Sequence, residues 1–358
     1  MKKRKKVICL FLCICVLGVG CGSKTSERTQ DSGSGQQAEE NNNKDNQEVK
    51  IGFSFDSFVI ERWIRDRDVF VSTAKKLGAS VNVQNANGSV QEQISQIQYL
   101  IDKNVDVLAV VAADCAALSD VMHAAKEKGI KTISYDRLIL NGDSDLYVSF
   151  NNKAVGTLMG KELKRDLPDG GQIIMIQGAE EDNNVKLVYQ GFMEELEGSN
   201  LEVVYEAHCK GWRAELAVDY LDEALEKYPD VSGIMCGNDD IAAQVVRVLA
   251  EHRLAGKVQV VGQDGDLAAC QRIVEGTQTM TAFKSVELLA KVAARYAVSM
   301  AKGEKLSRIN SSINDGSGDI PFCMLQPISV TSRNMDEIII DGGYHSVEDV
   351  YLNVPRED

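Results

Sequence analysis

From residue 49 onward, the chain alternates between short β-branched runs and longer segments with helical periodicity. The runs VKIGFSF (49–55), VDVLAVVA (105–112) and IKTISY (130–135) are rich in Val and Ile and have the length of strands. Amphipathic segments at 61–77 and 90–103 lie between them. Apolar strands that alternate with helices form parallel sheets covered on both faces. The pattern therefore predicts an α/β fold.

The same alternation starts again at LYVSF (146–150). It continues through QTMTAF (278–283) to a long amphipathic segment at 285–302. A chain of 358 residues is longer than a single core usually supports. We therefore expect two Rossmann-like lobes, each a parallel sheet flanked by helices, with the chain crossing between them more than once.

Polar residues stand where the predicted strands end. In open α/β sheets, ligands bind outside the carboxyl ends of the strands, so these residues predict two halves of one polar cleft. Asp and Asn are also preferred helix N-caps, and we expect this simpler role for Asp114, Asn151, Asn152 and Asp240. The strand-end positions are Asp56, Asp114, Asp136-Arg137, Asn151-Asn152, Asp182-Asn183-Asn184, Asn238-Asp239-Asp240, Asp264 and Lys284.

The chemistry of these strand ends favours a sugar. Hydroxyl groups both donate and accept hydrogen bonds, and a mixture of carboxylates, amides and guanidinium groups suits them. The two tryptophans of the chain, Trp63 and Trp212, each follow a polar loop, and indole rings pack on the C–H faces of a pyranose. Either indole could instead be a core residue. GTLMGKE (156–162) resembles a phosphate-binding loop only superficially, because its spacing is too short.

The first 48 residues differ from the rest. KKRKK and a 13-residue apolar run (7–19) precede small residues and Cys21, which predicts a lipoprotein signal at 1–20 with Cys21 lipidated. The apolar run is too short for a membrane span, which needs about 20 residues, and a simple cleaved secretory signal is the alternative. Residues 21–48 are almost devoid of apolar side chains, so they predict a disordered tether.

Composition excludes several functional classes. The formal net charge of −14 argues against a nucleic-acid partner. The five cysteines after Cys21 have no metal-site spacing and are expected to be small buried apolar residues. The four histidines are scattered, and the cleft acids have basic or amide neighbours instead of forming a carboxylate pair, so we predict neither an enzyme nor a metal site nor a cofactor.

Several segments together resemble the sugar-binding, type I periplasmic-binding-protein family of ABC importers, most closely its D-xylose-binding members. The resemblance runs from about residue 49 to the end of the chain, and it implies two Rossmann-like lobes that are joined by a three-segment hinge and close on the sugar. The segments are ERWIRDRDVF (61–70), VNVQNANG (81–88), ISYDRLI (133–139), YVSFNN (147–152), DNNVKL (182–187), GNDDIAA (237–243), VGQDGDLA (261–268) and GTQTMTAFK (276–284).

The resemblance also implies a role for each polar residue of the cleft. In the first lobe the implied sugar contacts are Arg62, Asp136 and Arg137. In the second lobe they are Asp182, Asn184, Asn238 and Asp264. Lys284 lies at a hinge crossing, and Trp63 and Trp212 match the pair of indoles that enclose the pyranose ring. The segment VVAADCAAL (110–118) departs from the family pattern, since it has small residues where an aromatic and polar loop is usual.

The resemblance implies a first lobe of residues 49–150 plus 284–322 and a second of 151–283 plus 323–358. Together with the lipoprotein signal, it implies a monomeric protein, lipid-anchored to the outer face of the cytoplasmic membrane, that delivers D-xylose, or a close aldopyranose, to an ABC permease and its ATPase. The alternative partner is a membrane histidine kinase, for which the protein would be a sugar sensor. A sugar-responsive repressor with the same core would need an N-terminal DNA-binding helix-turn-helix, which the sequence lacks.

Overall fold

The structure is a computed structural model that describes residues 48–307 and 309–356. The predicted signal (1–20), Cys21 and all but the last residue of the predicted tether lie outside these described residues. Within the described part, no helix combines the length and the apolar character that crossing a membrane requires.

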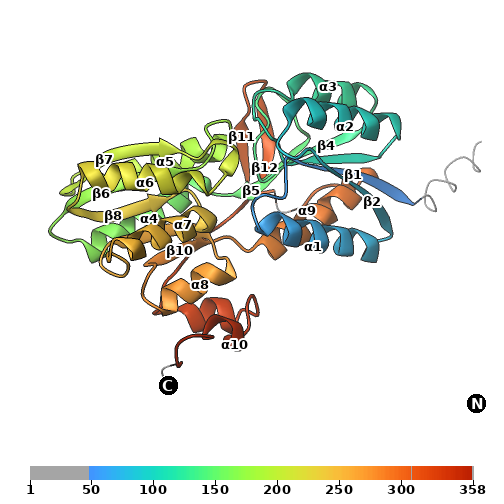
Figure 1. Ribbon diagram of the computed structural model, residues 1–358. Helices are drawn as coiled ribbons and strands as arrows, with labels where there is room; N and C mark the ends of the chain where they lie inside the picture. The colour runs from blue at the N-terminus through green and yellow to red at the C-terminus, as the bar shows by residue number, and fades with distance from the viewer. Residues whose placement is uncertain (1–47, 308, 357–358) are drawn as a thin grey trace, which may run out of the picture. The chain divides into compact units, whose positions relative to one another are not determined.

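The first sheet has seven strands in the order β11-β12-β5-β4-β3-β1-β2, and only β11 runs antiparallel to its neighbour. Helices α1 (Arg62–Lys76) and α9 (Val286–Ala301) lie on one face, and α2 (Val90–Asp102) and α3 (Ser119–Glu127) lie on the other (Figure 1). The strand bounds are β1 (Val49–Phe55), β2 (Ala79–Asn85), β3 (Val107–Val110), β4 (Lys131–Tyr135), β5 (Leu146–Phe150), β11 (Ser311–Asn314) and β12 (Asp319–Leu325).

The second sheet has six strands in the order β13-β10-β9-β8-β6-β7, with β13 antiparallel to β10. Its strand bounds are β6 (Gly171–Gln177), β7 (Leu201–His208), β8 (Val231–Cys236), β9 (Gln259–Asp264), β10 (Met280–Phe283) and β13 (Ile328–Val330). Its main helices are α4 (Asn152–Asp166), α5 (Asn183–Leu196), α6 (Leu216–Lys227) and α7 (Asp239–Glu251).

Strand β6 shows how this second sheet is covered on both faces. Ile173 and Met175 join one apolar cluster with α4 and α5, whereas Ile174 and Ile176 join another with α6 and α7. Successive side chains of a strand point to opposite faces, so a continuous apolar run needs helices on both sides.

The chain crosses between the sheets three times: from β5 to α4, from β10 to α9, and from β12 to β13. This topology confirms the predicted fold of two α/β lobes. The last crossing was expected after residue 322, but β12 continues to Leu325 and pairs Cys323 with Val148 of β5. Residues 323–325 therefore belong to the first sheet, although the expected boundary placed them in the second lobe.

The C-terminal region contains elements that the sequence pattern does not predict. These are the short strands β11 to β13, the π-helix Asp336–Ile340 and the one-turn helix α10 (Val347–Val350). Helix α8 (Leu267–Val274) packs beside α10. The three strands have three to seven residues, and β11 (SSIN) is polar, so tertiary pairing decides their conformation. The five cysteines of the described residues are free and buried, as predicted.

The predicted helix caps are only partly correct. Asn151 is the N-cap of α4, and its side chain accepts a hydrogen bond from a backbone N–H of the first turn. The prediction is wrong for Asp114, Asn152 and Asp240. Asn152 and Asp240 lie inside the first turns of α4 and α7, and Asp114 closes a turn ahead of α3. Asp182 and Asn238 are the residues that cap α5 and α7.

Candidate functional site

The predicted site residues come from the carboxyl ends of strands in both sheets. Arg62 and Trp63 begin α1 after β1, and Asp136 and Arg137 follow β4. From the second sheet, Asp182 and Asn184 follow β6, Trp212 ends the 3-10 turn Lys210–Trp212 after β7, and Asp264 ends β9. Lys284 follows β10, where the chain crosses to α9. The order of strands within each sheet therefore carries side chains that are distant in sequence to one place.

Nine of the ten predicted residues line one cavity of about 20 Å³, together with Ile60. Every one of the nine is buried. The volume leaves room for little more than one water molecule, because the charged side chains fill the space by pairing with one another. The nine are Arg62, Trp63, Asp136, Arg137, Asp182, Asn184, Trp212, Asp264 and Lys284.

Asn238 does not line this cavity. Its side-chain oxygen accepts a hydrogen bond from Ile241 N at 2.9 Å, which is the N-cap contact of α7. Its Nδ2 is buried and has no hydrogen-bond partner among the described residues. Asn238 thus lies near the end of β8 as expected, but in the structure it acts as a helix cap.

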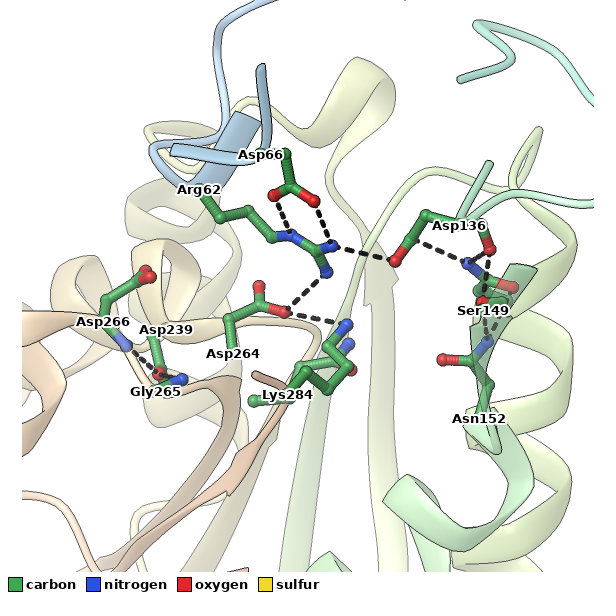
Figure 2. A network of polar contacts seen from close by, with 12 residues as sticks. Arg62, Asp66, Asp136, Ser149, Asn152, Asp239, Asp264, Gly265, Asp266 and Lys284 are labelled. Atoms are coloured by element: carbon green, nitrogen blue, oxygen red, sulfur yellow. Dashed lines mark hydrogen bonds and ion pairs between the residues drawn. The ribbon is translucent and has the colours of Figure 1, made fainter. Parts of the chain in front are cut away.

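Arg62 ties acids of both lobes together. Its guanidinium lies 3.2 Å from Asp66, 3.0 Å from Asp136 and 3.5 Å from Asp264 of the second lobe (Figure 2). Asp264 is also 2.8 Å from the Lys284 ammonium. Burial tends to raise the pKa of Asp264, but Lys284 and Arg62 outweigh it, and the pKa is lowered below its usual value. Asp264 is therefore held as a carboxylate, ready to accept hydrogen bonds.

Arg137 makes a second link between the lobes. Its Nη1 donates to Asp56 Oδ2 at 2.8 Å and to Ala112 O at 2.9 Å. Its Nε lies 2.8 Å from Asp182 Oδ2 of the second lobe, an ion pair without the alignment of a hydrogen bond. Burial raises the pKa of Asp182, with Arg137 opposing the rise. The Arg137 Nη2 has no hydrogen-bond partner in the described residues.

Both tryptophans lie close to this arginine. The Arg137 guanidinium carbon is 5.5 Å from the centre of the Trp63 ring and 5.9 Å from that of Trp212. Both indole Nε1 atoms are buried, and neither has a hydrogen-bond partner among the described residues. Buried polar groups are nearly always paired, so these donors, with Nη2 of Arg137, indicate a site that lacks acceptors.

Three of the cavity residues have a strained backbone. Asp136, Trp212 and Asp264 have φ values of 60°, 59° and 107°, in the region that residues other than glycine rarely adopt. Such strain persists only where the surrounding structure imposes it, and it is concentrated at functional sites. A larger cavity of about 520 Å³ opens beside the first and shares Arg137, Asp182 and Trp212 with it. The small residues Ala113 and Asp114 of segment 110–118 line this second cavity.

Comparison with known proteins identifies the family of the chain. Residues 51–305 match the family described as periplasmic binding protein domain, which is well over half of the chain. The chain belongs to the periplasmic binding protein family. It is 40% identical to a D-xylose-binding periplasmic protein of Haemophilus influenzae, over 87% of this chain and 95% of that protein. It is 39% identical to the D-xylose-binding periplasmic protein of Escherichia coli, over 84% and 92% of the two chains.

Solved structures of this family share the fold. A solute-binding protein from Clostridium phytofermentans with bound β-D-glucose has a TM-score of 0.77 and 28% identity, over 84% of this chain and 99% of that one. One from Chloroflexus aurantiacus in complex with D-glucose also has a TM-score of 0.77, with 25% identity over 85% and 98%. The type I periplasmic-binding-protein fold is thereby confirmed.

This binding protein also contains buried acids that the sequence analysis did not select as sugar contacts, although it listed Asp56 among the polar strand ends. Asp66 bonds Arg62 through both oxygens and accepts a hydrogen bond from the Tyr135 hydroxyl. Asp56 pairs with Arg137. The four-residue spacing of Arg62 and Asp66 on one helix was a readable signal, since residues i and i+4 are neighbours. The pairing of Asp56 with Arg137 joins different strands, so no local pattern could reveal it.

Asp239 is a further acid that sequence reasoning missed. The sequence analysis placed it only among the polar strand ends, but it is buried and accepts hydrogen bonds from Gly265 N at 2.9 Å, Asp266 N at 3.2 Å and Thr281 Oγ1 at 2.7 Å. Burial raises its pKa to about 6. Asp239 therefore holds the turn that follows Asp264 and acts as a positioning residue.

Proposed function

We propose that this periplasmic binding protein binds D-xylose, or a close aldopyranose, in the cavity between its lobes. One observation carries the proposal. Charged and aromatic side chains of both lobes converge on one buried cavity, and two indole N–H groups and an arginine nitrogen of these side chains have no acceptor among the described residues. Sugar hydroxyls accept such hydrogen bonds and also donate to carboxylates such as Asp136 and Asp264. The names of the two relatives near 40% identity support xylose.

Binding would replace the ion pairs that now fill the cavity. Arg62 and Arg137 each pair with an acid of the opposite lobe, so the lobes must part before a pyranose can enter. A sugar that bonds to both lobes then favours the closed arrangement by its differential affinity. Charged partners would give specificity, because an analogue without one hydroxyl leaves a buried charge unpaired.

D-Glucose is the second candidate ligand, because both solved structures described above contain glucose. D-Glucopyranose differs from D-xylopyranose by a hydroxymethyl group on C5. The two sugars thus probe the same hydroxyl contacts and differ in the space that they need.

Isothermal titration of the compact unit Glu48–Asp358 with D-xylose, D-glucose, D-ribose and D-galactose tests the proposal. We expect one-to-one binding with D-xylose bound most tightly. Heat with D-glucose alone would assign the cavity to a hexose. The absence of heat with all four sugars would contradict a monosaccharide site.

The proposal extends to a lipid-anchored monomer on the outer face of the cytoplasmic membrane that delivers sugar to an ABC permease and its ATPase. The periplasmic names of the relatives and the lipoprotein signal predicted at residues 1–20 support it. Feeding producing cells with labelled palmitate should label the chain, and Cys21→Ala should abolish the label. A wild-type chain without label would contradict the lipid anchor and leave sugar binding untouched.

A further inference from the structure

Three carboxylates from two lobes meet beside the cavity. Glu61 precedes α1 in the first lobe, whereas Asp240 lies in the first turn of α7 and Asp266 immediately precedes α8 in the second. One oxygen of each lies within 4.8 Å of one oxygen of each of the others. None of the three lines the cavity assigned to the sugar. They therefore form a separate cluster at the place where the lobes meet.

Asp266 is the residue that points to a ligand. It is only 9% exposed, and its Oδ2 is buried without a hydrogen-bond partner among the described residues. An Asp at an N-cap normally turns its carboxylate back to a backbone N–H of the helix, but Asp266 makes no such contact with α8. Figure 2 shows the carboxylate pointing away from the hydrogen bond that the Asp266 N–H donates to Asp239. One Asp266 oxygen lies within 4.8 Å of an oxygen of Glu61 and of Asp240, so an unpaired buried carboxylate belongs to the cluster.

The basic residues nearby are engaged elsewhere. Arg62 pairs with Asp66 and Asp136, and Lys284 pairs with Asp264. Burial, followed by the charges of Asp239, Asp264 and Asp240, raises the pKa of Asp266 well above its usual value. Burial and then Asp264 raise the pKa of Asp240 to about 6. Arg272 opposes the rise at Asp240, but it donates its hydrogen bonds to Gln278 and to the Asp239 carbonyl. Bringing these acids together thus has an electrostatic cost that Arg272 offsets only in part.

We propose that Glu61, Asp240 and Asp266 bind a divalent cation, specifically Ca²⁺, and that the bound cation holds the two lobes together. An all-carboxylate set suits a hard cation, with water completing the coordination. Ca²⁺ accepts oxygen ligands in a flexible geometry, whereas Mg²⁺ demands a near-ideal octahedron, and two oxygens on opposite sides of Ca²⁺ lie about 4.6–5.2 Å apart. Oxygens within 4.8 Å of one another can therefore share one Ca²⁺.

The cation site is complete only when the lobes are closed, because Glu61 and the two aspartates come from different lobes. Ca²⁺ would then stabilise the same arrangement that sugar stabilises, and each ligand would tighten the binding of the other. This reciprocal effect rests on the proposed sugar-binding function, whereas binding of Ca²⁺ to the cluster does not.

The test is a calorimetric titration of Ca²⁺ into EDTA-treated, desalted protein, with and without D-xylose. We expect one Ca²⁺ site, tightened roughly 5- to 150-fold by the sugar, as is typical of coupled sites. Glu61→Gln and Asp266→Asn should each weaken Ca²⁺ binding at least tenfold. The matched control is Glu251→Gln, which removes a surface carboxylate that is exposed, as Glu61 is, and pairs with Arg247; this variant should bind Ca²⁺ like the wild type.

Sugar titrations of Glu61→Gln in EDTA separate this inference from the proposed function. In EDTA the variant should bind D-xylose as the wild type does. Adding Ca²⁺ should raise the D-xylose affinity of the wild type but not that of the variant. No Ca²⁺ heat up to about 10 mM, well above the weakest range of protein calcium sites, would overturn the inference even if xylose binds. Wild-type Ca²⁺ affinity in both variants would overturn it as well. Ca²⁺ binding without any sugar binding would instead contradict the proposed sugar-binding function and leave the cation site supported.

Discussion

At the scale of single residues, the cavity depends on which acids keep their charge. Asp264 is held ionised by Lys284 and Arg62, whereas burial raises the pKa of Asp66 and Asp182 despite their arginine partners. A carboxylate with two cationic neighbours accepts hydrogen bonds strongly and cannot be replaced by a neutral acceptor without loss. The charge of Asp264 therefore matters more than its shape.

Replacing Asp264 with Asn tests this charge. Asp264→Asn keeps the size of the side chain and tolerates the positive φ, so the fold should survive. A hydrogen bond to a charged group contributes about 1.5–3 kcal/mol, so D-xylose affinity should fall on the order of 10- to 100-fold in a calorimetric titration. Asp222→Asn, which alters an exposed pair with His252, is the control and should bind normally. Unchanged D-xylose affinity in Asp264→Asn would show that the charge of Asp264 does not take part in sugar binding.

Gly178 sets the position of the Trp212 ring. A Cβ at Gly178 would lie 2.2 Å from Cη2 of Trp212, far inside van der Waals contact, so Gly178→Ala must displace the indole. We expect weaker D-xylose binding and altered tryptophan fluorescence with the secondary structure intact. Gly318→Ala is the control, since nothing lies within 4 Å of the Cβ that it would add. Normal sugar affinity in Gly178→Ala would mean that Trp212 does not contact the ligand.

At the scale of elements, glycines decide how closely α4 and α5 approach. A Cβ at Gly156 would lie 1.9 Å from Val188 O, and a Cβ at Gly191 would lie 1.9 Å from Lys153 O. The backbones of α4 and α5 thus touch at points where no side chain fits. The glycines of the run GTLMGKE serve this helix packing, which agrees with the absence of a phosphate-binding spacing.

Gly191→Ala should therefore destabilise the second lobe. Overpacking of a close contact costs about 1–3 kcal/mol, and a clash with a backbone oxygen belongs at the upper end of that range. Urea denaturation followed by circular dichroism should show a lower midpoint than in the wild type. The Gly318→Ala variant again provides the comparison. An unchanged midpoint would show that α4 and α5 can separate without loss.

The C-terminal segment contacts the turn after β9 through a titratable group. His345 Nε2, taken as the protonated nitrogen, donates to Gly265 O at 2.9 Å. Burial lowers the pKa of His345 below 6.5. As the pH falls, the imidazole is therefore protonated more readily in the unfolded chain than in the folded one. The contribution of neutral His345 to stability is present above about pH 6.5 and is lost below it. His345 thus links folding of the C-terminal segment to pH.

His345→Gln should reduce this pH dependence, because Gln retains a donor but does not titrate. Between pH 7.5 and 5.5, the free energy of unfolding should fall less in the variant than in the wild type, since all other groups contribute alike to both. Urea titrations at the two pH values measure the difference. An equal fall in the free energy of unfolding of both proteins would mean that folding does not change the pKa of His345.

At the scale of the whole molecule, the three crossings between the sheets let ligand binding act on both lobes. Arg62 and Arg137 each connect an acid of the first lobe with an acid of the second, over more than 40 positions in the sequence. A sugar that replaces these pairs must contribute enough free energy to close the lobes again. Its effect should therefore appear in the stability of the protein as a whole.

D-Xylose at 100 times its dissociation constant should raise the free energy of unfolding by about 2.7 kcal/mol. Thermal denaturation with increasing sugar measures this as a rising midpoint. Asp264→Asn should need a proportionally higher sugar concentration for the same shift, which serves as the internal control. A wild-type midpoint that does not change over the whole range of sugar would argue against binding to the folded state.

Much of the fold could be read from the sequence. Periodicity located most helices and strands up to residue 302, because each depends on a pattern within its own segment. It could not locate β11 to β13, whose short or polar strands are stabilised by pairing with β5 and β10. It also misjudged Asn152 and Asp240, because a cap is defined by the residue at which the helix begins, and that boundary depends on packing.

For the site, strand-end polarity together with family resemblance selected nine residues that the structure gathers around one cavity. The sequence by itself determined the α/β class and the supply of polar side chains at strand ends, since both follow from local periodicity. Only the tertiary structure decided which of these residues meet. Asn238 lies outside the cavity, Asp56 and Asp66 hold its arginines, and Glu61 meets Asp240 and Asp266. Contacts between residues up to about 200 positions apart depend on how the chain crosses between sheets and how the lobes pack, which no local pattern encodes.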